Sequence, residues 1–320
     1  MSRRDYNQKT FLDYLSAGSG RRRKRLERLD QLSAQFDWSR LDRLFDEISC
    51  AKRGGSGYPP LCLFKALLLA QWYNLSDPAL EDALADRLSF RRFCGFPLDE
   101  DTPDETTFVR FRAKLRALKL YEKLFAEVNQ QIEQKGFLVK SGTLIDASII
   151  KARAKPPREK EGVVSMVDPD AGFTKKRKES YFGYKIHIGV DAGSDLIRKV
   201  ETSSASLHDS LAFGALVCGD EQKVYADKAY GSAENRKLLE DNGIEDRLMY
   251  KAVRNKPLKS WQTWFNKAVS SIRAAVERVF AIGQNSYGLE QTRYFGEDRV
   301  EANCLMFSTA YNMRRVLSLA

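Results

Sequence analysis

The spacing of apolar residues changes near Gly136, and this change constrains the fold more than any single motif. Before that point, apolar residues recur three and four positions apart, as in FDWSRLDRLFDEI and LCLFKALLLAQWYNL, which is typical of helices. After it, GTLIDASII, YFGYKIHIGVDAG and DLIRKVETSS have the pattern of strands, and the glycine and polar residues from Asp191 to Asp195 indicate a hairpin turn. The sequence therefore predicts a helical domain over residues 1–135 and a second domain over residues 136–320.

The second domain is predicted to alternate strands with helices after its first three strands. We expect a helix near 209–218, a strand at QKVYADKAY, a helix near 233–241, a short strand at DRLMYKAV and a long helix near 261–282. This order implies a mixed α/β domain, in which a mixed sheet is covered by helices. Residues 151–180, between the first two strands, are rich in Lys, Glu, Pro and Gly, so we expect a flexible basic loop there.

The chain is basic, with 53 Lys and Arg against 43 Asp and Glu, which gives a net charge of +10. A surface of this kind often meets nucleic acid, although charge alone does not identify a partner. No apolar run reaches the roughly 18 residues that a membrane span needs, and the start MSRRDYNQKTFLDYL lacks the layout of a signal peptide. We therefore expect a cytoplasmic protein, with no membrane partner.

Cysteine and histidine usage limits the metal chemistry. The five cysteines are widely scattered and form no CxxC pair, which argues against a disulfide framework and against a zinc finger. Only His187 and His208 are available as imidazole ligands, so carboxylates are the expected ligands of any metal ion. Hard ions such as magnesium suit carboxylates.

Two acids occupy unusual positions on predicted strands. Asp146 lies in the middle of an otherwise apolar strand, where a carboxylate is costly to desolvate unless a cation or several donors compensate it. Asp227 ends KVYAD, where the strand gives way to the loop KAYGS, a favoured place for ligand-binding groups in open sheets. The two strand acids could therefore converge on one metal.

The third candidate acid is Glu277, in the helix segment SIRAAVERVF. The core stripe of this helix is expected to be Ile272, Val276, Val279 and Phe280. Arg273 and Glu277 lie one turn apart beside this stripe. Three such acids can hold a pair of metal ions that lie about 3.5 to 4 Å from each other. Such a pair can activate a water or a DNA 3′-hydroxyl and stabilise the leaving oxygen. Arg273 would then hold a phosphate through two parallel hydrogen bonds.

Simpler interpretations exist for each residue taken alone. An acid near a strand end is usually solvated or caps the next turn, and an Arg/Glu pair at i,i+4 is usually a surface ion pair. Lys185 and His187 share one face of YKIHIGV, so they either line the site or form the polar face of an edge strand. His208 with Asp209, before a helix, is either a local cap or a catalytic base.

Three basic segments are candidates for contact with DNA. RFRAKLRALK places cations along a helix near a capped turn, as a DNA-reading helix would. Its candidate contact residues are Arg110, Arg112, Lys114 and Arg116. RRRKRLER at 21–28 either grips phosphates or is a solvated arm. KAVRNKPLKSWQTW adds cations and two tryptophans that either stack on bases or belong to the core.

Taken in order, these segments resemble bacterial transposases of the insertion sequence five family, within the wider family of DDE transposases. YPPLCLFKALLLAQWYNLSDPALEDALADRLSFRRFCGF and PDETTFVRFR are similar to the family's N-terminal domain. GTLIDASII, GYKIHIGVD, VYADKAYGS and RAAVERVF are similar to its catalytic blocks, and GLEQTRYFG and a C-terminal helix follow. The order and spacing of the blocks are far more specific than any one block.

The resemblance implies a ribonuclease H-like catalytic domain, with a mixed five-stranded sheet flanked by helices, after an all-α DNA-binding domain. It implies that Asp146, Asp227 and Glu277 are the ligands of Mg²⁺, in two ions and with Mn²⁺ as a substitute. It implies that Arg273 is the accompanying arginine. The implied activity is cleavage of DNA at insertion-element ends, with strand transfer into target DNA.

The same resemblance implies the partners. These are double-stranded DNA, in the form of target DNA and of terminal inverted repeats that the helical region contacts, and further copies of the chain in a homodimer or larger assembly. The implied location is the nucleoid of a bacterial cytoplasm.

One departure from the family pattern concerns the long helix. Related transposases commonly carry Tyr three positions before the arginine and Lys seven positions after the glutamate, where this chain has Ser270 and Gln284. Three rivals to a transposase remain: a nuclease of the same fold that never joins strands, a DNA-binding protein that has lost catalysis, and a basic protein with a structural carboxylate cluster.

Overall fold

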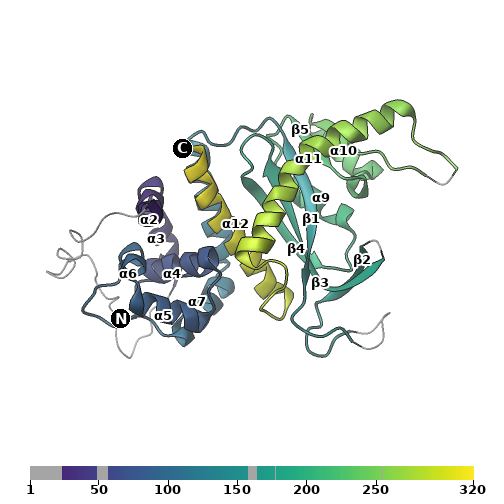
Figure 1. Ribbon diagram of the computed structural model, residues 1–320. Coiled ribbons are helices and arrows are strands. Elements are labelled where there is room, and N and C mark those ends of the chain that lie inside the picture. Colours follow the sequence, from purple (N-terminus) through teal and green to yellow (C-terminus); the bar gives the residue numbers. More distant parts are fainter. Residues whose placement is uncertain (1–23, 49–56, 158–163, 177, 254) are drawn as a thin grey trace. The chain divides into compact units, whose positions relative to one another are not determined.

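The computed structural model describes residues 24–48, 57–157, 164–176, 178–253 and 255–320. The chain divides into two compact units (Figure 1). The helical unit comprises Met1–Gln131 with Thr309–Ser318 and Ala320, and the sheet unit comprises Ile132–Ser308 with Leu319. The division falls close to the predicted boundary at residue 135, but the end of the last helix joins the helical unit.

Eight described elements precede the first strand, and the last of them, α8, ends three residues inside the sheet unit. They are α2 (Lys24–Gln35), α3 (Trp38–Leu44), η1 (Phe45–Glu47), α4 (Pro60–Tyr73), α5 (Asp77–Asp86), α6 (Leu88–Cys94), α7 (Glu105–Ala117) and α8 (Leu120–Gln134). The central helix α4 is apolar on nearly every side and is largely buried, as a helix inside a bundle must be. Within the described ranges, no helix combines the length and apolar character needed to cross a membrane.

Polar contacts explain why the end of α12 (Glu297–Leu319) belongs to the helical unit. The indole Nε1 of the buried Trp72 donates to the carbonyl oxygen of Ala310 at 2.8 Å. Arg314 donates to the carbonyl oxygen of Trp72 at 3.1 Å, and its guanidinium lies 5.4 Å from the indole ring. These contacts join residues more than 200 positions apart, which no local sequence pattern encodes.

The sheet unit alternates strands and helices. Its elements are β1 (Thr143–Lys151), β2 (Gly172–Lys176), β3 (Glu179–Asp191), β4 (Ile197–Ser204), η2 (Asp209–Ala212), α9 (Phe213–Leu216), β5 (Lys223–Ala226), η3 (Lys228–Tyr230), α10 (Ala233–Asp241), β6 (Glu245–Leu248), α11 (Ser260–Tyr287) and the start of α12. The main strand order is β4-β3-β1-β5-β6, in which β3 is antiparallel to β1 and β4, and β5 is parallel to β1 and β6. The predicted mixed α/β fold is confirmed.

The sheet has six strands rather than the expected five, because part of the predicted loop at 151–180 forms β2. Strand β2 pairs with the first residues of β3, and the rings of Phe173 and Phe182 lie 4.9 Å apart across this pair. Such a cross-strand aromatic contact stabilises a hairpin that composition alone does not suggest. Gly183 is required on β3, because its φ is +154° and an added Cβ would lie 2.2 Å from the carbonyl oxygen of Ile150.

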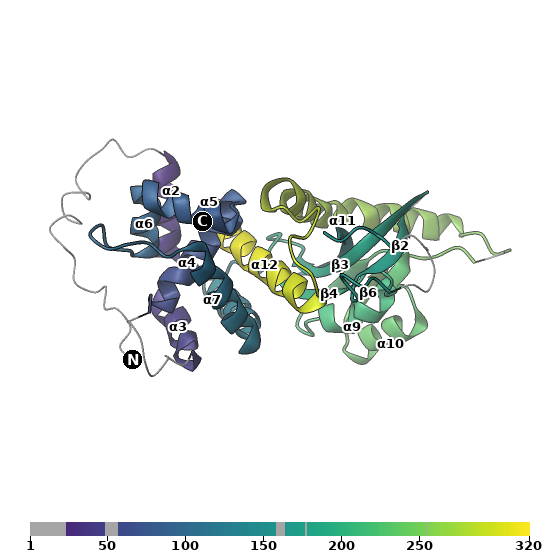
Figure 2. The same ribbon diagram turned by 90° about the horizontal axis from the view of Figure 1, so that it is seen from below.

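Helices cover both faces of the sheet: α11 lies on one face, and α9 and α10 lie on the other (Figure 2). The core under α9 and α10 includes Ile145 and Phe213, both fully buried. Because side chains alternate along a strand, Asp146 points away from this core, to the face that α11 covers. The fold thus places an acid of β1 opposite the long helix.

Candidate active site

The candidate site is a cleft of about 500 Å³ at the end of β5. The pairing of β1 with β5 ends at Ile145 and Ala226, while β1 continues to Lys151. The edge of β1 beyond this point lines the cleft. Asp146, Asp227, Arg273 and Glu277 all line it, so the structure brings the four predicted residues together.

Asp146 is the most enclosed of the three acids, with 22% of its side chain exposed. Its Oδ1 accepts a hydrogen bond from the backbone of Ala147 at 2.9 Å, and its Oδ2 lies 2.9 Å from Nη2 of Arg273. Burial raises the pKa of Asp146, the charge of Arg273 opposes this, and the charges of Asp227 and Glu277 raise the pKa further. The three acids therefore repel one another, and a cation among them would relieve that repulsion.

Asp227 follows β5 directly and has 37% of its side chain exposed. Its Oδ1 accepts from the backbone N–H of Lys228 at 2.6 Å, so it caps η3, and the same oxygen lies 4.0 Å from Nη1 of Arg273. Asp227 therefore caps η3 and lines the cleft at the same time. The cap fixes the direction of the carboxylate.

Arg273 is the charged centre of the cleft and is 8% exposed. Its Nη1 also contacts the sulfur of Met249 at 3.7 Å, while its buried Nε has no hydrogen-bond partner within the described residues. Ile272, predicted to belong to the core stripe, is 43% exposed, so that prediction is wrong. The helix is rotated so that Arg273 takes the inward position, where the two strand acids compensate its charge.

Glu277 lies one turn after Arg273 on α11 and is exposed where it lines the cleft. In the part of the chain that the structure describes, its carboxylate forms no ion pair. Farther along the helix, Nε2 of Gln284 donates to Oγ of Ser148 on β1 at 3.1 Å, which also lines the cleft. Gln284, at one of the two departures from the family pattern, therefore reaches the site.

Lys185 lines the cleft, whereas His187 does not belong to its lining. The Nζ of Lys185 lies 2.8 Å from Oδ1 of Asp209 and donates to the carbonyl of Leu207 at 2.7 Å. His187 is fully buried, with Nε2 at 2.9 Å from Oγ of Ser203, and burial lowers its pKa to about 4. His187 is therefore a neutral core group rather than a polar residue of an edge strand.

His208 acts as a local cap, the simpler of its two interpretations. Its side chain accepts a hydrogen bond from the backbone N–H of Ser210, at the start of η2, and it is exposed. It is not among the residues that line the cleft. Its neighbour Asp209 differs, because Asp209 lines the cleft and forms an ion pair with Lys185.

Among the residues that line the cleft, sequence reasoning gave no role to Thr174, Lys175 and Lys176 on β2. Their segment was expected to be a loop, so no position could be assigned to them. The available signal was the run KKRK, which is dense in positive charge. Two of these lysines, Lys175 and Lys176, are exposed at the rim.

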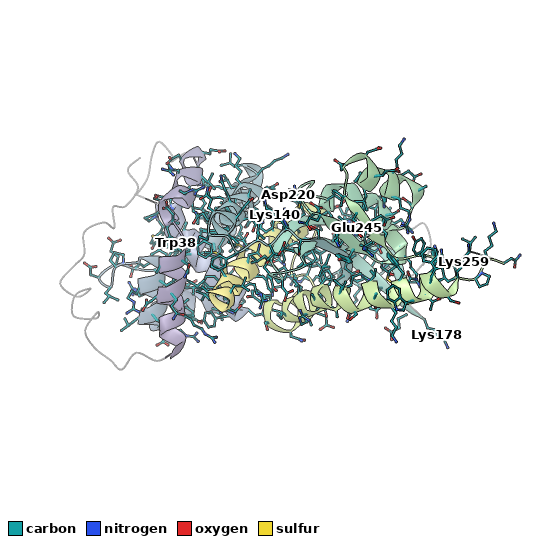
Figure 3. The ribbon with its side chains drawn as sticks, turned by 90° about the horizontal axis from the view of Figure 1, so that it is seen from above. Trp38, Lys140, Lys178, Asp220, Glu245 and Lys259 are labelled. Atoms are coloured by element: carbon teal, nitrogen blue, oxygen red, sulfur yellow. The ribbon has the colours of Figure 1, made fainter. Side chains whose placement is uncertain are left out.

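A second group of possible ligands, Cys218, Asp220 and Glu221, is the one metal-like cluster in which all ligand atoms lie within 4.8 Å among the described residues. Its charges are already balanced. Despite burial, hydrogen bonds from Lys140 and Arg198 lower the pKa of Asp220 to about 2 (Figure 3). Burial raises the pKa of the Cys218 thiol to about 11, which keeps it protonated and makes it a poor ligand.

In the helical unit, α7 carries the four predicted DNA-contact residues. Arg110 and Lys114 are exposed, and Arg116 is half-buried. Arg112 forms an ion pair with Asp77 of α5, so it contributes to packing within the unit. In the basic segment RRRKRLER at 21–28, residues 21–23 lie outside the described residues, as do the side chains of 24–27.

Comparisons with known proteins identify the family of the chain. Residues 138–313 match the family described as Transposase DDE domain, and residues 19–114 match the family described as Transposase domain (DUF772). The first match spans more than half of the chain. The chain therefore belongs to the Transposase DDE domain family, and it is a DDE transposase.

One solved structure is also similar, that of a piggyBac transposase synaptic complex with hairpin DNA. The likeness has 10% sequence identity and a TM-score of 0.45, and it covers 92% of this chain and 73% of that chain. It is too weak to bear on the site.

Proposed function

We propose that Asp146, Asp227 and Glu277 are the carboxylate triad with which this transposase cleaves and joins DNA strands. The observation that carries the proposal is their convergence: three acids from β1, from the end of β5 and from α11 line one cleft together with Arg273. A surface ion pair or a lone helix cap would explain each residue singly, but not the common cleft. The pKa of the most enclosed acid, Asp146, is raised mainly by its burial, and the charges of Asp227 and Glu277 raise it further.

The donor set fits a hard divalent cation, because all three candidate ligands are carboxylates. We propose Mg²⁺ as the natural ion, Mn²⁺ as a substitute and two ions per site, held by Asp146, Asp227 and Glu277. Bound there, the ions would activate the attacking oxygen and stabilise the leaving oxygen of the phosphodiester. Arg273 compensates the acids in the structure, and its guanidinium is suited to hold a phosphate oxygen of bound DNA.

The proposed reaction has two displacements at phosphorus. Water first cleaves the phosphodiester at the end of the element and frees a 3′-hydroxyl, which then attacks a phosphodiester of the target DNA. No covalent bond to the protein is formed. The role of the protein is to hold the scissile phosphate and the nucleophile in line, with Asp146 from β1, Asp227 from the end of β5, and Arg273 and Glu277 from α11 lining one cleft.

We also propose the transposase family within the DDE group and the partners of the protein. The order of motifs supports the insertion sequence five family and therefore double-stranded DNA partners, namely terminal inverted repeats and target DNA. The exposed Arg110 and Lys114 on α7 are proposed to contact duplex DNA in the helical unit. Because two element ends must be processed together, we expect a homodimer or larger assembly on DNA, in the bacterial cytoplasm at the nucleoid.

A joining assay tests the proposed reaction against its closest rival, a nuclease of the same fold. A labelled, pre-cleaved element end is incubated with plasmid and Mg²⁺, and the products are separated by size. The proposal predicts label covalently joined to plasmid. Nicked plasmid without joined label would identify a nuclease, and binding without either product would identify a DNA-binding protein that has lost catalysis.

A further inference from the structure

Two of the four tryptophans are on the surface, which is unusual for the largest apolar side chain. Trp261 is 53% exposed and Trp264 is 73% exposed, both in the first two turns of α11. The other two, Trp38 and Trp72, contact Phe93 within the helical unit. Exposed aromatic side chains that lie close together mark a binding surface more often than isolated ones do.

The segment around these tryptophans is strongly and uniformly positive. Residues 249–276 contain six Lys or Arg and no Asp or Glu, and the first acid that follows is Glu277 of the cleft. The exposed lysines of this segment, which includes both tryptophans, are Lys251, Lys256, Lys259 and Lys267. Lys259 lies at the outer end of α11, away from the sheet (Figure 3). A surface of this charge attracts a polyanion.

Contacts with Tyr250 hold this surface in place. Trp261 and Phe265 both pack against the ring of Tyr250 edge-on, with centroids 5.2 Å and 5.3 Å away. Asn266 accepts from the backbone N–H of Tyr250 at 2.8 Å and donates to its carbonyl at 2.9 Å, which ties the preceding segment to α11. Tyr250 thus holds Trp261 in place, while Trp264, one turn later on α11, is 73% exposed.

We propose that this aromatic and basic face, consisting of Lys251, Lys256, Lys259, Trp261, Trp264 and Lys267, binds unpaired bases of a DNA strand. Indole rings stack on any base, and lysines neutralise the phosphates between bases. Duplex DNA offers few free base faces, so the face favours a single strand. A second copy of the chain fits less well, because two such faces would bring their cations together with no acid to offset them.

The position of the face relates it to the cleft. Trp264 precedes Glu277 by 13 residues of the continuous helix α11, which is about 20 Å at 1.5 Å per residue. A strand that leaves the cleft can cover that distance within a few nucleotides. The inference rests on the proposed function for its DNA partner, but its test requires no catalysis.

The test measures binding of a labelled oligothymidine of about 16 nucleotides, which has no secondary structure, and of a duplex of equal length. We expect Trp264→Ala to weaken single-strand binding at least about fivefold, with a much smaller effect on the duplex, and Trp264→Phe to retain most of the affinity. Fluorotryptophan-labelled protein should show the resonances of Trp261 and Trp264 shifting on binding while those of Trp38 and Trp72 stay fixed. Resonances of Trp38 and Trp72 at their wild-type positions also show that the variants are folded.

Equal single-strand affinities for the wild type and Trp264→Ala would overturn the inference. So would a change of sedimentation from dimer to monomer in Trp264→Ala without DNA, because the face would then be a contact between copies. Failure of the joining assay, with single-strand binding intact and dependent on Trp264, would reject the proposed reaction and leave this inference standing.

Discussion

Replacing His187 by glutamine should flatten the acid side of the stability profile. His187 is fully buried, and burial lowers the pKa of its imidazole from 6.5 to about 4. Because the pKa in the folded protein lies below that in the unfolded chain, the unfolded chain binds the additional proton between these values. The contribution of neutral His187 to stability is therefore complete above pH 6.5 and is lost as the pH falls towards 4.

The gap of about 2.5 pH units corresponds to about 3 kcal/mol of unfolding free energy, at about 1.4 kcal/mol per unit. Urea unfolding followed by circular dichroism from pH 7.5 to 4.5 measures most of this loss. The cost of His187→Gln relative to wild type should shrink as the pH falls. His208→Gln, which removes the other histidine, at an exposed position, is the matched control. Parallel profiles for the wild type and His187→Gln would refute the reasoning.

Three further predictions concern packing and DNA contact. Gly183→Ala should cost more than about 1 kcal/mol, because the added methyl collides with backbone atoms, whereas Gly57→Ala, with no atom within 4 Å of the new Cβ, should cost little in thermal unfolding. Arg110→Gln should weaken duplex binding and lower the salt slope by about one, and an unchanged slope would remove α7 from the interface. Arg112→Gln should instead lower the melting temperature, because its ion pair with Asp77 joins α7 to α5, and an unchanged melting temperature would contradict that role.

The two strand acids of the cleft could be singled out from the sequence because each occupies an unusual place in its strand. Asp146 interrupts an apolar strand, and Asp227 ends one, so their strands predict a common end of the sheet. The helical repeat placed Glu277 on the same helix as Arg273. It did not predict that Arg273 is inward and Ile272 exposed, because periodicity assigns the buried face to apolar residues. The two strand acids on the facing sheet compensate the charge of this buried arginine.

Features that depend on partners far apart in the sequence could not be predicted. Strand β2 has few apolar residues, and it forms because Phe173 meets Phe182 and its backbone pairs with β3. The end of α12 packs with the helical unit through the indole of Trp72 and the backbone of Ala310. In both cases the interaction that decides the structure joins two segments, and neither segment carries it alone.

The most direct test of the triad is the joining assay with variants of its acids. Asp227→Asn and Glu277→Gln keep the size of each side chain and remove its charge, and Glu234→Gln, an exposed acid on α10, is the matched control. With Mg²⁺ and at equal DNA binding, the account predicts joined product for the wild type and Glu234→Gln, and a loss of at least about a hundredfold for the two triad variants. Joined product at the wild-type level from either triad variant would contradict the account.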